Sequence, residues 1–404
     1  MGSFCVRIGS HLGVIVRWRR LAVYSGDRFN ILGVGKTTLC KSTVPSHSTG
    51  ELEMIGAIRR IILSNWINYF TRRAPEHPLL IALKKTTNRK WNNAPIPLAL
   101  LVRTDDGCLD RPSHVEQSPK IAIDFQKTLT EYARLDAEYF AYRLMLGAWS
   151  TSNYSLSGHI IDLESASFVK YRGPYYTSSS KHPHNLFGYE GLGFIRILHQ
   201  LADVKKINKR NIKDSFYVER RIHLGHCFLL LLGIRNKQAT IFYKKHRDQV
   251  MSLSNQFEKL AKKTRPQDTD LNLYISIPDN KDPSEFDTSN LFRNLTKIYK
   301  SQKREGEALD AMTRKITGRT SPDEISGFIR DLFELLDLLG REGYLEDEDG
   351  WGSRLRRINQ NLPSMFELNE KIKPLVELYR LGKISPKSLG KKIKKLCRIP
   401  VTAK

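Results

Sequence analysis

The sequence predicts an α+β protein, in which a small β-rich region precedes a larger helical part. Apolar and β-branched runs bounded by turn residues occur within 6–35, 79–83 and 96–103, and such runs are typical of strands. Further along the chain, apolar residues recur with the three-to-four-residue period of helices that bury one face. The predicted regions are a β-rich lobe over 1–117, a helical lobe over 118–263 and a carboxy-terminal helical region over 264–404.

The composition indicates a folded and strongly basic protein. The 404 residues are 40% apolar, which is enough for a sizeable core and for more than one domain. The 66 Lys and Arg residues against 42 Asp and Glu give a formal charge of +24, which suggests nucleic acid, an anionic membrane or an acidic protein as a partner. The densest basic run, 391–395, also suits a solvated helix end.

Cysteine usage and hydropathy bear on location. The five cysteines stand singly without a CxxC pair, so they predict neither a zinc site nor a disulfide framework, and a reducing, cytoplasmic location is expected. The longest strongly apolar run, 227–234, is far shorter than the roughly 20 residues of a bilayer span. We therefore expect no transmembrane segment.

The first motif is glycine-rich and ends the amino-terminal strands. Residues 29–38 read Phe-Asn-Ile-Leu-Gly-Val-Gly-Lys-Thr-Thr. A P-loop needs glycine six residues before Lys36, where this chain has Asn30, and a helix should follow directly. A strand end in which Gly33 and Gly35 face a nucleotide, or a plain β-turn, is the favoured interpretation.

A helix and two strands follow. Polar residues at 49–51 precede a helical stripe that predicts about 20 helical residues. Its apolar members are Leu52, Ile55, Ile58, Ile62, Trp66 and Phe70. The strand at 96–103 ends in Arg103, and Arg111 follows eight residues later. Two guanidinium forks at the end of a sheet suit polyphosphate, although surface pairs with Asp105 or Asp110 would explain both arginines equally well.

A predicted helix over 121–146 leads into a predicted hairpin. Residues 154–156 and 159–163 can form strands, and Ser157-Gly158 is a turn dipeptide. The hairpin would bring Asn153 and Asp162 together, and their oxygens are hard ligands of the kind that Mg²⁺ accepts. A surface hairpin without a metal is the alternative. Helical patterns continue over 193–201 and 228–263, and a capping box at 321–324 begins a later helix.

These motifs, in this order, resemble the SelO family of protein adenylyltransferases, over about residues 1–260. Leu-Gly-Val-Gly at 32–35 is similar to the family's L-K-G-x-G, Arg103 and Arg111 to its phosphate-binding arginines, and Ser-Thr-Ser-Asn153 with Asp162 to its N-T-D-N…D. The resemblance implies a kinase-like two-lobed fold with extra carboxy-terminal helices, and transfer of AMP from ATP to protein hydroxyl groups. It also implies Mg²⁺ or Mn²⁺ on Asn153 and Asp162, and nucleotide binding by Gly33, Gly35, Lys36, Arg103 and Arg111.

Three positions depart from the family pattern. Ser152 occupies the position of the family's catalytic base, and Leu32 that of its nucleotide-binding lysine. Arg60 occupies the position of the glutamate that pairs with that lysine. Lys36 and Glu51 or Glu53 lie near enough in sequence to substitute for the last two. The chain therefore resembles a truncated or degenerate relative, of the kind associated with bacterial microcin-maturation clusters.

Two function classes follow from these patterns. The favoured class is a nucleotide-binding, SelO-like protein that is a weakened AMP transferase or a pseudoenzyme with a scaffold role. The alternative is a basic binding or scaffold protein for nucleic acid or an acidic protein. The sequence contains no RNP-type aromatic motif and no helix-turn-helix pattern, which favours the first class.

Overall fold

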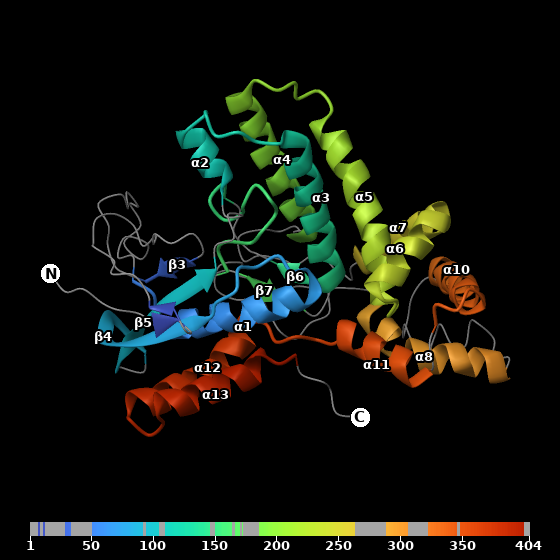
Figure 1. Ribbon diagram of the computed structural model, residues 1–404. Helices are drawn as coiled ribbons and strands as arrows, with labels where there is room; N and C mark the ends of the chain where they lie inside the picture. Colours follow the sequence, from blue (N-terminus) through green and yellow to red (C-terminus); the bar gives the residue numbers. More distant parts are fainter. Residues whose placement is uncertain are drawn as a thin grey trace. The chain divides into compact units, whose positions relative to one another are not determined.

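Two compact units make up the described part of the chain (Figure 1). Unit 1 comprises 1–114, 152–165 and 365–398, and unit 2 comprises 115–151, 166–364 and 399–404. The predicted α+β class is confirmed, with mostly helices and a small antiparallel sheet in the amino-terminal part. The computed structural model describes residues 7–8, 11–12, 29–33, 51–91, 94–104, 110–145, 150–163, 166–169, 172, 186–262, 288–305, 322–345 and 348–399.

The main sheet of unit 1 is antiparallel, with the order β3-β5-β4. Its strands are β3 (Phe29–Leu32), β4 (Leu79–Trp91) and β5 (Ala94–Thr104). The central strand β5 carries the buried residues Leu98, Ala99, Leu101 and Val102, which explains why its apolar run is nearly continuous. The predicted strands at 79–83 and 96–103 are thus confirmed, and β4 extends well beyond its prediction. A separate pair is formed by β1 (Arg7–Ile8) and β2 (His11–Leu12).

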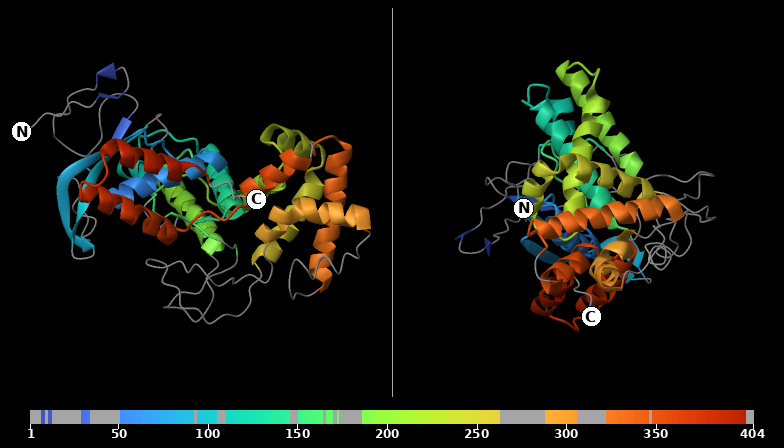
Figure 2. Two further views of the ribbon diagram at one scale, coloured as in Figure 1. Left: turned by 90° about the horizontal axis from the view of Figure 1, so that it is seen from below. Right: turned by 90° about the vertical axis from the view of Figure 1, so that its right-hand side faces the viewer.

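Helix α1 (Met54–Phe70) lies between β3 and β4 in sequence and forms the centre of unit 1. Strands β4 and β5 pack on it, and so do helices α12 (Met365–Arg380) and α13 (Pro386–Cys397). Figure 2 shows the last two as a helical hairpin. A helix covered on several sides should be apolar around most of its circumference. The buried residues Ile55, Ile58, Ile62 and Trp66 confirm most of the predicted stripe.

Unit 2 is a helical assembly. Helices α3 (Phe125–Tyr142), α4 (Leu186–Lys205) and α5 (Ile212–Leu231) pack against one another, and α7 (Arg247–Lys262) packs on α5. Aromatic rings fill the core, where Phe257 lies 5.6, 5.4 and 5.4 Å from Phe140, Phe228 and Phe292 between ring centroids. The other elements are α2 (Pro112–Gln117), β6 (Leu144–Met145), β7 (Ser167–Phe168), α6 (Asn236–Lys245), α8 (Thr288–Glu305), α10 (Pro322–Arg341) and α11 (Glu348–Ile358).

The predicted ends of the helix over 121–146 were wrong, for local reasons. Asp124 caps α3, and its Oδ1 accepts a hydrogen bond from the Lys127 amide at 2.9 Å, so the helix begins at Phe125. Arg143 ends it with a left-handed backbone at φ 59°. The predicted strand at 271–277 lies outside the described residues. In the described part of the chain, no helix combines the length and apolar character that crossing a bilayer requires.

Candidate functional site

The predicted turn is present in unit 1 and joins two candidate ligands, although residues 154–156 and 159–163 form no regular strands. Tyr154 and Ile160 form an antiparallel bridge. The carbonyl oxygen of Asn153 accepts hydrogen bonds from the amides of Ile161 and Asp162 at 2.8 and 3.3 Å. Asn153 and Asp162 are therefore neighbours at the open end of this segment, which we call the 153–162 hairpin.

The two predicted phosphate-binding arginines both reach this hairpin. Arg103 is only 2% exposed, and its Nη1 donates to the carbonyl oxygen of Ile161 at 2.9 Å. Arg111 is half-buried, and its Nη1 donates to the carbonyl oxygen of Ser152 at 2.9 Å. The structure thus brings both arginines to the residues next to Asn153 and Asp162, with Arg111 at Ser152 and Arg103 at Ile161.

A third arginine, which the sequence prediction left out of the site, contacts Asp162. Helix α1 positions Arg60 so that its Nη2 lies 2.9 Å from Asp162 Oδ1, with side chains that are 10% and 37% exposed. A divalent cation on this carboxylate would face a guanidinium at contact distance. In the described ranges, no group of three His, Cys, Asp or Glu side chains could hold a metal ion. The contact of Arg60 with Asp162 does not fit the implied Mg²⁺ or Mn²⁺ on this carboxylate.

The electrostatic environment of the hairpin is positive. Burial, reinforced by Arg103 and Arg60, lowers the pKa of His77 to about 3, so this imidazole is neutral at physiological pH. Its Nδ1 is buried, and no described group hydrogen-bonds to it. Arg73 adds a further positive charge, and its Nη1 donates a hydrogen bond to the carbonyl oxygen of Ser157 at 3.2 Å. An anion is the ligand class that such a field favours.

Ser152 occupies the position that the resemblance assigns to a catalytic base. Its hydroxyl lies 3.4 Å from Asn153 Oδ1, and a neutral hydroxyl is a poor proton acceptor at neutral pH. Within 152–162 the sequence has one carboxylate, Asp162, which already contacts Arg60. The hairpin therefore has the parts of an anion site, and its carboxylate is not placed as a base beside Asn153.

The glycine motif is only partly described. Gly33 has a φ of +91°, and a Cβ there would lie 2.4 Å from the carbonyl oxygen of Ala99, so a side chain is excluded by both backbone and packing. Leu32 pairs with Leu101 across β3 and β5. Of the possible substitutes, Glu51 forms an ion pair with Lys85 at 3.0 Å. Gly35 and Lys36 lie outside the described residues.

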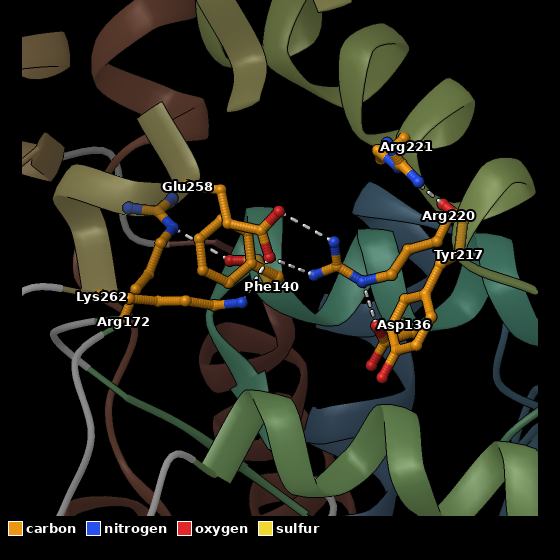
Figure 3. Close-up of polar contacts among 8 residues, drawn as sticks. All are labelled: Asp136, Phe140, Arg172, Tyr217, Arg220, Arg221, Glu258 and Lys262. Carbon is orange, nitrogen blue, oxygen red and sulfur yellow. Dashed lines mark hydrogen bonds and ion pairs between the residues drawn. The ribbon is translucent and has the colours of Figure 1, made fainter. Parts of the chain in front are cut away.

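A second charged cluster, the Arg220 cluster, is buried in unit 2 (Figure 3). Arg220 forms ion pairs with Asp136 and with Glu258, the latter at 2.7 Å, and Lys262 also pairs with Glu258. The Arg220 guanidinium and the Lys262 ammonium lie 5.8 and 5.3 Å from the ring centroid of Phe140. The basic and acidic side chains of the Arg220 cluster pair with one another across α3, α5 and α7. We therefore interpret the cluster as structural.

One member of the Arg220 cluster predicts a pH-dependent stability. Burial raises the pKa of Glu258, but Arg220 and Lys262 outweigh it and lower the pKa to about 2. Because the folded-state pKa lies below the unfolded one, the stabilisation is complete above about pH 4.5 and is lost as the pH falls towards 2. Glu258→Gln should remove up to about 3 kcal/mol from the free energy of unfolding at neutral pH.

Denaturant titrations at several pH values measure this effect. The difference between wild type and Glu258→Gln should shrink steadily as the pH falls from about 4.5 to 2. Glu334→Gln, at an exposed position of α10, is the control and should stay within about 0.5 kcal/mol of wild type. A difference between Glu258→Gln and wild type that does not change with pH would contradict the assignment.

Comparisons with models of protein families and with curated proteins gave no match. The 153–162 hairpin, its arginines and the sequence motifs are the features of this chain that indicate a function.

Proposed function

We propose that the chain is a SelO-like nucleotide-binding protein whose capacity to transfer AMP from ATP to protein hydroxyl groups is weakened or lost. The observation that carries this proposal is the convergence of Arg103, Arg111 and Arg60 on the hairpin that joins Asn153 to Asp162. Guanidinium groups are the preferred donors to polyphosphate oxygens. A cytoplasmic location, expected from a sequence whose cysteines stand singly without a CxxC pair, would expose this site to ATP.

The topology of unit 1 supports a kinase-like small lobe. The sheet order β3-β5-β4, with a packed helix between β3 and β4, is the order expected for such a lobe. In protein kinases, a lysine on strand β3 pairs with a glutamate on the helix that follows, and a separate aspartate holds the metal. The corresponding positions here carry Leu32, Arg60 and Asp162. The proposed likeness to kinases is one of architecture, in which the charges have been rearranged.

The chemistry of AMP transfer explains why we propose a weakened enzyme. The substrate hydroxyl oxygen would attack the α-phosphorus of ATP, pyrophosphate would leave, and the hydroxyl proton would go to a general base. Ser152 cannot act as that base without help. Positioning and charge stabilisation alone can leave residual transfer, so the site supports nucleotide binding more strongly than catalysis.

Calorimetric titration with ATP and with adenosine tests this proposal. Arg111→Ala should weaken ATP binding about 10–100-fold and adenosine binding little, because a charge-assisted hydrogen bond to phosphate contributes about 1.5–3 kcal/mol. Arg111 suits the test better than Arg103, whose burial makes truncation a threat to the fold. Arg380→Ala, at an exposed position of α12 in the same unit, is the control. Absence of ATP binding by the wild type would refute the proposal.

One observation favours a second function, the binding of nucleic acid. Helix α13 exposes Lys387, Lys391, Lys392, Lys394 and Lys395, and no acidic residue occurs from 381 onward. Binding through these lysines would weaken steeply as salt is raised, for single-stranded RNA as for any polyphosphate chain. It would also be insensitive to Arg111→Ala, which separates it from the first proposal.

A further inference from the structure

The positive charge beside Asp162 is a side chain of the protein, the Arg60 guanidinium. Arg60 Nη2 lies 2.9 Å from Asp162 Oδ1, which is the length of a charge-assisted hydrogen bond. Arg60 is an interior residue of α1, a helix fixed by packing against β4, β5, α12 and α13. The guanidinium is therefore placed by the core of unit 1, and it reaches the site at the open end of the hairpin.

We propose that Arg60 takes the place of the divalent cation, so that unit 1 binds nucleoside polyphosphates without a metal ion. This inference rests on the proposed nucleotide binding and states which group neutralises the phosphate charge. A metal ion at such a site neutralises phosphate charge and links it to a carboxylate. A guanidinium presents five N–H donors in a planar fork, so it can hold a carboxylate and phosphate oxygens together.

The surroundings of Arg60 favour an anion over a cation. Arg73, Arg103 and Arg111 also donate to the segment 152–162, whose sequence contains one carboxylate. The neutral His77 beside Arg60 and Arg103 adds no negative charge. A divalent cation would enter against several guanidinium groups, whereas a polyphosphate would complement them. The Asp162 side chain is 37% exposed and the Arg60 side chain 10%, so a ligand from solvent would reach the guanidinium along the carboxylate side of this ion pair.

The decisive measurement is the affinity for ATP in excess EDTA and in excess Mg²⁺. The wild type should bind ATP in EDTA, with an affinity within about threefold of that in Mg²⁺, which corresponds to less than 1 kcal/mol. Arg60→Met removes the charge and retains an unbranched side chain. It should lose about 10–100-fold in EDTA and regain affinity in Mg²⁺, because the guanidinium that contacts Asp162 would then be absent.

Two further variants separate the role of Arg60 from a general loss of structure. Arg59→Met changes the preceding buried arginine, whose Nη1 donates to Asn369 Oδ1 at 3.0 Å on α12, and should leave the EDTA affinity close to wild type. Arg60→Lys keeps the charge and should retain part of the metal-independent binding. An unfolding transition recorded for each variant identifies any that fails to fold.

The outcomes distinguish this inference from the proposal on which it rests. ATP binding by the wild type only in Mg²⁺ would overturn the role of Arg60 and leave nucleotide binding intact. Equal losses in Arg59→Met and Arg60→Met, with both variants folded, would also overturn that role. No ATP binding under either condition would overturn the proposed function and the inference together.

Discussion

Arg220→Ala is expected to lower the free energy of unfolding of unit 2 by about 3–5 kcal/mol, because it leaves buried carboxylates without their main counter-ion. Asp136 is 2% exposed, and Arg220 is the positive group with the largest effect on its pKa, opposing the rise that burial causes. Glu258 would keep its ion pair with Lys262, so most of the lost free energy of unfolding should arise at Asp136. Denaturant unfolding followed by near-ultraviolet circular dichroism measures the loss.

The neighbouring residue provides a matched control. Arg221 lies on the same helix, and its Nε donates to the exposed carbonyl oxygen of Tyr217 at 3.3 Å (Figure 3). Arg221→Ala should therefore change the free energy of unfolding by no more than about 0.5 kcal/mol. Removing both charges, with Arg220→Met and Asp136→Asn, should recover part of the loss. Equal effects of Arg220→Ala and Arg221→Ala would show that the Arg220 cluster contributes nothing specific.

If the proposed function holds, placing a base and a lysine at the positions that the resemblance assigns to them should raise AMP transfer. General-base assistance contributes about 10²–10⁴-fold, and an aspartate at 152 would stand next to Asn153, where the resemblance expects it. Ser152→Asp alone should give a small gain, because the lysine position still carries Leu32 and Asp162 still pairs with Arg60. Ser152→Asp with Leu32→Lys should give a larger gain. Adding Arg60→Glu should give a larger one again, since it places a glutamate where the resemblance pairs one with the lysine and removes the guanidinium that contacts Asp162.

Labelled ATP in the presence of Mg²⁺ or Mn²⁺, followed by measurement of AMP incorporated per protein, tests this series. Ser157→Asp places a carboxylate at the turn of the same hairpin and should give no gain. A triple variant that binds the metal nucleotide and still transfers nothing would disprove the lost-base account. It would favour a scaffold role instead.

Local signals in the sequence were enough to predict the parts of the site. The dipeptide Ser157-Gly158, between a possible strand at 154–156 and the β-branched run at 159–163, predicted the hairpin, and the structure has Gly158 at φ +75°. An apolar run ending in Arg103 predicted a strand that delivers an arginine to the site. Both inferences depend on the order of residues within a few positions, which sequence reasoning handles well. The kinase-like architecture and the roles of these residues stay predictions.

Partners distant in sequence were not predictable in the same way. Arg60 and Asp162 are 102 residues apart, and Arg220 lies 84 residues from Asp136. An arginine in a helix pattern looks like a solvated side chain until the helix is found covered on several sides, as α1 is. A lone carboxylate on a predicted loop likewise looks like a ligand until its counter-ion is known. Only tertiary packing reveals which of these charges meet.

The packing of α12 and α13 on α1 has a consequence for biosynthesis. Residues 365–398 leave the ribosome long after α1, and α1 cannot bury its apolar surface against them earlier. A nascent chain that has passed residue 162 thus holds every described residue of the site, yet lacks part of the support for the helix that carries Arg60. Such late, long-range contacts slow folding and leave apolar surface open to chaperones and proteases. We expect ribosome-bound chains arrested before residue 365 to be cut within α1, and released full-length chains to resist cleavage there.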